Sequence, residues 1–473
     1  MQRKSSWIAS ILFSFVCFLS FGQVPELEKL SWEDYILLVK NGHPAARQAE
    51  IAEEQGRAKL LEGRGGFDPK LYGDYSEKNF DSKRYYQIGE GGIKIPTWFG
   101  LEFKAAYQTS DGIFLNPQNT LPESGLIYTG VSMPLGADLF LDERRAELMK
   151  AKEFVRISEA EKALMLNSLY YEASSMYWDW YAANKTVEVY ANALTLAKQR
   201  LNAVKQSALY GDKPFIDTVE ASIQMQNWEY KLLEAQVTLK NERQRLSTFL
   251  WQDGWIPLEA DSSVIPPEDV KLPKSIYAYP NDSTLYQHPK LSQYQGLIEQ
   301  NKIDLRLARQ QLKPKLRVNY NPITEANQPI AYSSFAKDNY TWGVNFEMPL
   351  FMRKARGKLV QNQLYLENKE LELKRVLASV EYEFAASKNL WNTLQGQLKL
   401  TQATMTNYQK LWLGELQLFN GGESSLFVVN YRETSFVEAQ IKYINLQSKT
   451  QKAAIALWYA SGQLPKLVQS IAE

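Results

Sequence analysis

The sequence predicts an α+β fold built from two copies of one unit, in which short β-strands are combined with helices of unusual length. Three observations support this prediction. Landmark motifs recur in the same order, long proline-free stretches carry an apolar heptad period, and shorter segments alternate between apolar and polar residues. A sustained heptad period is typical of coiled coils, and strict alternation is typical of strands with one apolar face.

The first 22 residues have the features of a secretory signal peptide. Two basic residues precede an apolar run over residues 7–22, and Ser20 and Gly22 occupy the −3 and −1 positions of a cleavage site before Gln23. The alternative is a buried N-terminal helix, which the basic start and the small residues at the end disfavour. We therefore expect residues 1–22 to be removed on export.

Composition narrows the possible functions of the mature chain. The only cysteine, Cys17, lies in the predicted signal peptide and follows a poor lipidation box, so we predict neither disulfides, nor a catalytic thiol, nor a lipid anchor. Without residues 1–22, 52 basic and 53 acidic residues remain, and this net charge of −1 gives no electrostatic reason to expect nucleic acid. No later stretch reaches the roughly eighteen apolar residues of a membrane-spanning helix.

The chain repeats five landmarks at nearly matched spacing, which indicates an internal duplication. The pairs are His43-Pro44 with His288-Pro289, Phe67–Leu71 with Leu312–Leu316, Met133–Leu135 with Met348–Leu350, Gly211 with Gly422, and Leu246–Leu250 with Ile455–Ala460. The first copy is about 30 residues longer between its second and third landmarks. We predict a first repeat over residues 23–254, a proline-rich connector over 255–280, a second repeat over 281–462 and a C-terminal tail over 463–473.

Each repeat is predicted to contain a helix, two strands, a very long helix, a glycine turn and a return helix. The first helix spans about residues 31–62. Residues 137–210 contain no proline or glycine, and as one helix they would measure about 110 Å. Apolar residues step by seven, with only Lys162 breaking the first series, through Leu141, Leu148, Val155, Leu169, Met176, Ala183, Tyr190, Ala197 and Val204, and through Leu377, Phe384, Trp391, Leu398, Met405, Trp412 and Phe419. This period predicts coiled-coil packing, although a plain helical bundle or a filament would share it.

Alternation marks the strands of both repeats. Tyr340, Trp342, Val344 and Phe346 alternate with polar residues or glycine, and residues 316–321 and 127–133 show the same pattern. One face would suit lipid and the other water, as in a transmembrane β-barrel, but a half-buried soluble sheet has the same pattern. Four strands per chain cannot close a membrane barrel, whose minimum is about eight strands. Since open sheet edges do not occur in lipid, several chains would have to share one barrel.

Taken together, these features resemble the TolC-like family of outer-membrane efflux proteins over nearly the whole mature chain. The two glycine turns are the most similar parts. Residues 211–221, GDKPFIDTVEA, resemble the first periplasmic tip of the family, and residues 421–430, GGESSLFVVN, resemble the second. The His-Pro and Met-Pro-Leu motifs also stand where the family has such residues.

The resemblance implies an outer-membrane channel subunit of a tripartite efflux or secretion system. It implies a homotrimer in which each chain gives four membrane β-strands to a 12-stranded barrel, surrounded by outer-membrane lipid and continued by a long coiled-coil periplasmic tunnel. The connector, as an equatorial linker, and the C-terminal tail would form a collar around this tunnel. A periplasmic adaptor (membrane fusion protein) would dock at the tip and couple the passive duct to an inner-membrane pump.

The expected site residues fall into two groups. The lipid-facing group contains Tyr340, Trp342, Val344 and Phe346. The tip and adaptor-contact group contains Gly211, Phe215, Asp217, Gly421, Gly422, Ser425, Leu426 and Phe427. Glycine accepts the positive φ that a tight turn needs, and Pro214 or Ser424 can start the return helix.

Two tip features have alternative interpretations. Phe215, Leu426 and Phe427 are expected to be exposed and to contact an adaptor, but packing between helices of the trimer is an equal alternative. The resemblance implies that Asp217 helps to hold the entrance closed, whereas a first-turn aspartate is also favoured by the helix dipole alone. Val428 and Tyr431 stand where the best-known members carry an acidic ring, so gating by such a ring is not expected here.

No catalytic, metal or cofactor residues are predicted. His43 and His288 occupy equivalent proline-flanked positions, where a structural role is expected, and no glycine-rich phosphate loop follows a strand. Two other classes of protein share some of these features. A periplasmic coiled-coil adaptor or structural protein would not have alternating strands in both repeats, and a secreted hydrolase would need a catalytic cluster that the sequence does not offer.

Overall fold

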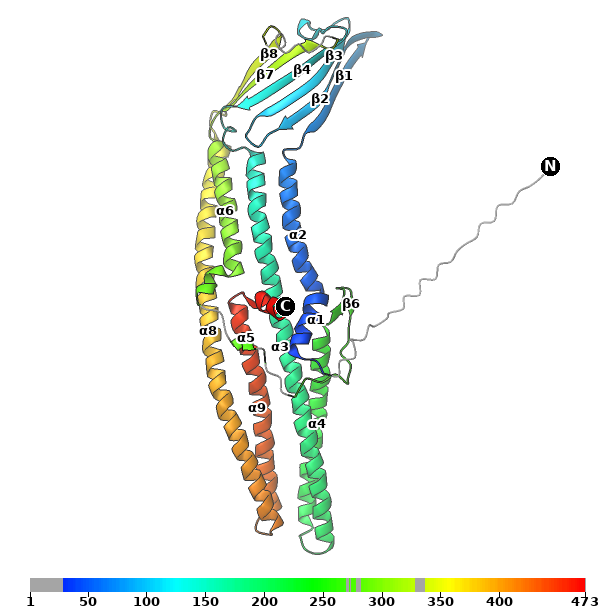
Figure 1. Cartoon of the computed structure of the whole chain (residues 1–473), viewed down its shortest axis with the longest axis vertical. Helices are drawn as coiled ribbons and strands as arrows, with labels where there is room; N and C mark the ends of the chain where they lie inside the picture. Colours follow the sequence, from blue (N-terminus) through cyan, green and yellow to red (C-terminus); the bar gives the residue numbers. More distant parts are fainter. Residues whose placement is uncertain (1–28, 269–271, 273, 278–281, 328–336, 473) are drawn as a thin grey trace, which may run out of the picture.

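The computed structural model describes residues 29–268, 272, 274–277, 282–327 and 337–472. The predicted signal peptide and parts of the predicted connector lie outside the described residues. A β-sheet stands at one end of several long helices, and the C-terminus lies about midway along them (Figure 1).

Both halves of the chain follow the order helix, strands, very long helix and return helix, although the first half has more strands. The first half contains α1 (Trp32–Gly42), α2 (Pro44–Gly65), β1 (Lys70–Phe80), β2 (Lys83–Pro96), β3 (Glu102–Asp111), η1 (Pro117–Asn119), β4 (Leu126–Pro134), α3 (Glu143–Leu209) and α4 (Ile216–Ser247). A connecting region follows, with β5 (Trp251–Gln252), β6 (Ile256–Pro257), α5 (Lys274–Tyr277) and η2 (Asp282–Gln287). The second half contains α6 (Pro289–Gln310), β7 (Lys315–Glu325), β8 (Tyr340–Glu347), α8 (Arg353–Asn420), α9 (Leu426–Ala460) and α10 (Leu464–Ala472).

The first helix is interrupted, so the prediction of one helix over residues 31–62 was wrong. Residues before a proline avoid the helical region, and His43 is extended, with φ −75° and ψ 134°. Its Nδ1 accepts a hydrogen bond from the N–H of Ala45 at 3.0 Å and thereby caps α2. His288 caps α6 in the same way, accepting from the N–H of Lys290 at 3.1 Å. Both histidines therefore serve as helix N-caps.

Within the described residues the sheet contains six strands, in the order β1-β2-β3-β4-β7-β8, and every neighbouring pair is antiparallel. The second half supplies the two predicted strands, but the first half supplies four. The prediction of four strands per chain was therefore wrong. The longer stretch of the first repeat forms additional strands, and the β2–β3 turn over residues 97–101 returns the chain to the helical side. Glycines at positions 89, 91 and 92 interrupt the alternation that marks the other strands in the sequence.

Two helices dominate the length of the molecule. α3 has 67 residues and α8 has 68, and each would measure about 100 Å. α3 begins six residues later than predicted because Asp142 caps it, accepting from the N–H of Arg145 at 2.9 Å. Near the sheet the helices pack in the order α2-α3-α6-α8, and at the far end in the order α4-α3-α9-α8. Among the described residues, no helix is both long and apolar enough to cross a membrane.

The largest hydrophobic core lies at the middle of the helices. There α1, the connecting region and α10 pack around α3 and α9, and the fully buried side chains include Trp32, Tyr35, Tyr177, Trp178 and Trp180. Three hydrogen bonds fix the layers: Trp32 Nε1 donates to Ser174 Oγ at 3.0 Å, the Tyr177 hydroxyl to the Leu30 carbonyl at 2.9 Å, and Trp458 Nε1 to the Ile276 carbonyl at 2.8 Å. This waist joins the two halves of the helical layer.

The cap at His288 predicts an acid-sensitive waist. Burial, with a smaller contribution from Lys290, lowers the pKa of His288 to about 4. The unfolded chain, with a histidine pKa of about 6.5, therefore binds more protons than the folded chain between these two values. The contribution of the neutral His288 cap to the free energy of unfolding should be complete above pH 6.5. It should fall by up to about 3 kcal/mol as the pH drops to 4.

His288→Asn is the matched test, because asparagine offers a cap acceptor that does not titrate in this range. Denaturant unfolding of both proteins should be followed from pH 7.5 to pH 4. The stability of the wild type should fall more steeply than that of the variant below pH 6.5. Parallel curves would show that His288 does not act as a neutral cap.

Candidate channel wall and helical tips

One face of the sheet is apolar across all six strands, except at the end far from the helices, where it carries Glu77, Gln87 and Asp111. The register places Phe103 opposite Ile95 and Val131, and Val318 opposite Met133 and Val344. The face comprises Leu71, Tyr75, Ile93, Ile95, Phe103, Tyr107, Ile127, Val131, Met133, Leu316, Val318, Tyr320, Tyr340, Trp342, Val344 and Phe346. All four residues predicted to face lipid therefore share one face with the apolar residues of the other five strands.

This apolar face is uncovered in the single chain. Leu71 is 85% exposed, Trp342 68% and Phe346 66%. Exposed aromatic residues gather at both ends of the strands: Trp98, Phe99, Phe140 and Phe351 near the helices, and Phe80 and Phe114 beside Tyr85 at the opposite end. An apolar band between two aromatic girdles is typical of membrane β-barrels, whereas soluble monomers rarely expose so large an apolar patch.

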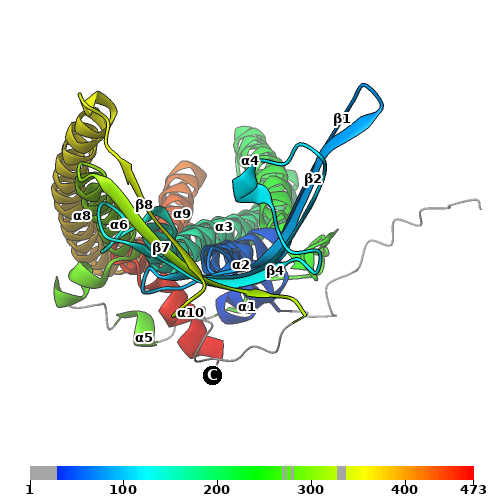
Figure 2. The ribbon, with the colours of Figure 1, turned by 90° about the horizontal axis from the view of Figure 1, so that it is seen from above.

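The opposite face is polar and concave. The hydroxyl oxygens of Tyr72 on β1 and Tyr128 on β4 lie 3.0 Å apart, although two strands separate them and flat strands would stand about 14 Å apart. Glu90 on β2 accepts hydrogen bonds from both hydroxyls, at 2.6 and 2.8 Å, and from Gln108 on β3 at 2.8 Å. The sheet curls toward the side of this network, as Figure 2 shows from above.

Two close approaches support the direction of curvature. On the polar face, a Cβ at Gly92 would lie 2.5 Å from the Cβ of Ala106, and one at Gly130 would lie 2.1 Å from Oδ1 of Asn321. On the apolar face, a Cβ at Gly73 or Gly91 would meet nothing closer than 3.8 Å, and one at Gly89 would lie 3.1 Å from the Thr109 hydroxyl. A Cβ at Gly343, on the polar face of the edge strand β8, would meet nothing within 4 Å. Side chains crowd on the inside of a bend and separate on the outside, so the polar face is the inner one.

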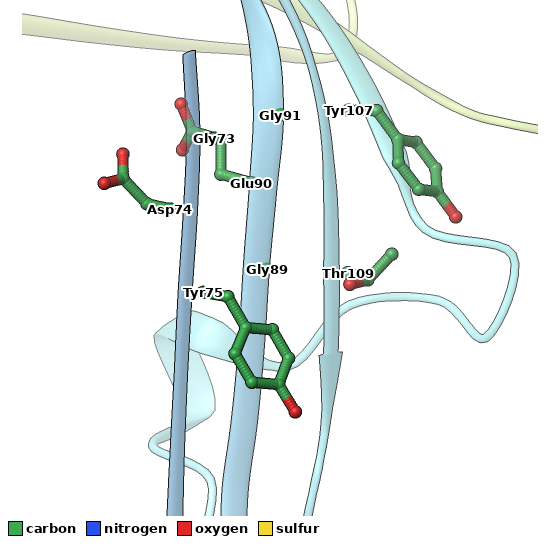
Figure 3. A pocket seen from close by; sticks show the side chains of 8 residues that line it. All are labelled: Gly73, Asp74, Tyr75, Gly89, Glu90, Gly91, Tyr107 and Thr109. Carbon is green, nitrogen blue, oxygen red and sulfur yellow. The ribbon is translucent and has the colours of Figure 1, made fainter. Parts of the chain in front are cut away.

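A shallow hollow of about 320 Å³ lies over β1, β2 and β3, lined by Gly73, Asp74, Tyr75, Gly89, Glu90, Gly91, Tyr107 and Thr109. Figure 3 shows the carboxylates of Asp74 and Glu90 on one side of the strands and the rings of Tyr75 and Tyr107 on the other. The glycines leave the gap between these rings. The hollow is thus a dip in the apolar surface, and its residues do not form a catalytic arrangement.

At the far end, the two helical hairpins turn in the same way. Gly211 and Gly422 have φ of +82° and +80°, and a Cβ at either would meet nothing within 4 Å. The N–H of Asp212 donates to the Ser207 carbonyl at 2.9 Å, and the N–H of Glu423 donates to the Leu418 carbonyl at 2.8 Å. This is the Schellman pattern, which needs a left-handed residue just after the helix. Gly421 has φ −78°, so it does not use the freedom predicted for it.

The return helices begin later than predicted. α4 begins at Ile216 and α9 at Leu426, two residues after Pro214 and Ser424 respectively. The Ser424 hydroxyl instead donates to the Glu415 carboxylate of α8, and Ser425 stands at the N-cap without a capping hydrogen bond from its side chain.

The three apolar residues predicted to be exposed at the tips differ in their burial. Leu426 is only 2% exposed because it packs against Leu201, Val204 and Ala221, so its prediction as an exposed adaptor contact was wrong. Phe215 is 77% exposed and Phe427 is 66% exposed. These two phenylalanines are therefore available to a partner.

The first tip contacts the second hairpin through Lys213. Its Nζ lies 3.2 Å from the centroid of the Phe419 ring of α8. Burial lowers the pKa of Lys213, and the half-buried Asp217 in the first turn of α4 acts in the opposite direction. Asp217 therefore favours the charged form of Lys213, which contacts both tips. Nothing in the sequence around these distant residues signals the contact.

A buried ion pair joins the two hairpins nearer the waist. Arg200 of α3 pairs with Glu433 of α9 and also donates to Asn430 Oδ1 at 3.0 Å. Asn430 donates in turn to Glu220 of α4 at 3.2 Å. Burial raises the pKa of Glu433, and Arg200 opposes this rise. The network fixes the α8–α9 hairpin against the α3–α4 hairpin.

The two outer helices of this layer expose apolar seams. On α4 the exposed residues follow a heptad period: Ile216, Val219, Ile223, Tyr230, Leu233 and Val237. α8, at the other edge, exposes Val360, Leu364, Leu371, Leu390, Leu400, Leu411 and Leu418. Seams of this kind are normally covered by a partner helix, so the layer is incomplete at both edges.

No protein-family model and no curated protein matches the sequence. Solved structures match it in fold. The CmeC outer membrane channel of Campylobacter jejuni is 14% identical, with a TM-score of 0.66 over 99% of this chain and 98% of that one. VceC of Vibrio cholerae, an outer membrane protein, is 13% identical, with a TM-score of 0.65 over 91% and 96%. The MtrE outer membrane channel of Neisseria gonorrhoeae, in its open state, is 13% identical, with a TM-score of 0.65 over 92% and 89%. The predicted TolC-like fold is thus confirmed over nearly the whole chain.

A paired substitution on β8 tests the assignment of faces. Val344, near the middle of the strand, lies on the apolar face, and its neighbour Asn345 lies on the polar face. If the apolar face contacts lipid, Val344→Arg places a charge in hydrocarbon and should reduce the free energy of unfolding in lipid vesicles by about 2–4 kcal/mol. Asn345→Arg should be close to neutral. Equal effects of the two substitutions would contradict the alternation.

Proposed function

We propose that this chain is the outer-membrane channel subunit of a tripartite efflux or secretion system. The observation that carries the proposal is the curled sheet, whose convex face is apolar and exposed in every strand, standing on helices about 100 Å long. Such a sheet suits lipid outside and water inside. The likeness in fold to outer membrane channels supports the same function.

The proposed assembly is a homotrimer. β1 and β8 are the two edges of the sheet, and α4 and α8 are the two edges of the helical layer at its far end. Pairing β8 of one copy with β1 of the next would satisfy the sheet edges, and packing α8 against the next α4 would cover both apolar seams. Repeated around an axis, one such contact closes a ring. The resemblance to the TolC-like family implies that three copies complete it.

The proposed location follows from this assembly. The predicted signal peptide would export the chain, the sheet would lie in the outer membrane, and the helices would extend as a tunnel through the periplasm. The tips at Gly211 and Gly422 would then face the inner membrane. There the exposed Phe215 and Phe427 would contact a periplasmic adaptor, which in turn binds an inner-membrane pump.

The subunit would supply the passage and not the energy, so it is proposed as a passive duct without a cofactor. Both histidines serve as helix caps, and the hollow on the sheet lies in an apolar surface. A periplasmic coiled-coil adaptor would account for the helices, but it would have no use for a curled sheet with an exposed apolar face.

The glycine pair of the second tip offers a test with a matched control. Gly422 has φ +80°, whereas Gly421, one residue earlier, has φ −78°. Gly422→Val forces a β-branched residue into the left-handed region and should distort the turn, while Gly421→Val places the same side chain in an allowed region. The sheet lies at the opposite end of the helices, so both variants should insert and assemble.

Trimer abundance in the outer membrane and export of a dye or drug should be measured in the same strains. We expect Gly422→Val to lower export per trimer several-fold and Gly421→Val to leave it near the wild-type value. Unchanged export per trimer in Gly422→Val would show that the geometry of this turn is not needed for export. A loss of trimers with full activity in the remainder would assign the turn to assembly alone.

A further inference from the structure

We infer that all six strands of each chain belong to the membrane wall, so that the barrel of the proposed trimer has eighteen strands. The inference rests on the proposed function and concerns β1 to β4, where the first repeat has four strands and the second has only two. It assigns the outer edge of β1, rather than an edge further into the sheet, as the surface that pairs with β8 of a second copy.

The hydrogen-bonded ladder is continuous from β1 to β4. β1 pairs with β2 from Lys70 to Phe80, with one bulge between Lys78 and Asn79. β2 pairs with β3 from Gln87 to Pro96, and β3 pairs with β4 from Glu102 to Gln108. β1 and β2 are therefore integral strands of the same sheet that contains β7 and β8.

Charge is segregated between the two faces of β1, β2 and β3. On the convex face, Glu77 and Asp111 lie at the end of the strands far from the helices. All convex positions between these two residues and the helices are uncharged: Leu71, Gly73, Tyr75, Gly89, Gly91, Ile93, Ile95, Phe103, Ala105, Tyr107 and Thr109. The charged residues of the same stretch lie on the concave face: Lys70, Asp74, Glu90, Lys94, Glu102 and Lys104. A hairpin projecting into water would have no reason to keep one face free of charge, whereas a lipid-facing wall requires it.

The polar network on the inner face holds β1 in the curve of the wall. Tyr72 of β1 reaches Glu90 and Tyr128, so hydrogen bonds connect β1 to β2 and β4 directly. Moving β1 and β2 together out of the wall would break the bonds to Tyr128 and Gln108 and leave Glu90 with Tyr72 as its donor from this network. It would also break the backbone ladder between β2 and β3, which runs from Gln87 to Pro96.

The width of the sheet agrees with this assignment. A strand tilted by about 40° with a spacing of about 4.8 Å occupies roughly 6 Å of the circumference, so six strands cover about 38 Å and four cover about 25 Å. Four helices packed 8–10 Å apart cover roughly 36 Å. Six strands therefore match the helical layer of the same chain. The passage would stay wide where it crosses the membrane, as in aqueous barrels of sixteen to eighteen strands.

Paired cysteines distinguish an eighteen-stranded wall from a twelve-stranded one. The only native cysteine, Cys17, lies in the predicted signal peptide, so introduced pairs give a clean signal. Asn345→Cys on β8 should be combined with each of Lys70→Cys, Asp74→Cys and Ser76→Cys on β1. The matched series uses Lys104→Cys, Ala106→Cys and Ser110→Cys on β3, which also point to the concave face. Oxidised outer membranes are then analysed for disulfide-linked copies.

We expect inter-subunit disulfides between β8 and at least one β1 position, and none with the β3 series. Disulfides between β8 and β3 would overturn the inference, because β1 and β2 would then lie outside a twelve-stranded wall, but the proposed trimer would stand. Cryo-electron microscopy of the trimer in lipid nanodiscs gives an independent strand count. Eighteen strands would support the inference and twelve would overturn it, whereas a monomer in lipid would overturn the proposed function itself.

Discussion

Backbone N–H and C=O groups at the edge of a sheet find no water inside a bilayer, and each unpaired group there costs several kcal/mol. This constraint governs the architecture. The convex face of the sheet suits lipid, but β1 and β8 each present an open edge. Curling brings the two edges toward the same side, as Figure 2 shows, without joining them within one chain. In the proposed assembly, a neighbouring copy supplies the missing pairing, so that the wall closes only when the copies come together.

The helical layer also has two incomplete edges. There the groups that need a partner are exposed apolar side chains, not unpaired backbone N–H and C=O groups. α4 and α8 carry exposed apolar residues at the edges of a layer whose interior is held by buried aromatic residues and by the Arg200–Glu433 pair. The waist around Trp32 and Tyr177 joins the two halves of one chain into a single segment of the proposed wall. The exposed phenylalanines at the tips lie beside rigid Schellman turns, which present them in fixed positions.

Much of this architecture is visible in the sequence, and the parts that are not have physical reasons. The landmarks and the heptads predicted the duplicated order and the long helices, and alternation predicted β4, β7 and β8. β2 was not predicted because glycines interrupt its alternation of apolar and polar residues. Gly89 and Gly91 occupy its apolar face, and Gly92 occupies its inner face, where Ala106 leaves no room for a side chain. At the tips, the positive φ of Gly211 and Gly422 followed from turn chemistry. The burial of Leu426 and the Lys213–Phe419 contact depend on how distant helices pack, which local patterns do not encode.

The mass of the protein extracted from membranes in mild detergent tests the central claim most directly. If each chain is one segment of a shared wall, native mass spectrometry should give three copies of the mature chain and no folded monomer, even on dilution. The measured subunit mass should also correspond to a chain that begins at Gln23. A folded, stable monomer would contradict the account, because it would show that the sheet is stable without a neighbour to pair with the backbone groups of β1 and β8.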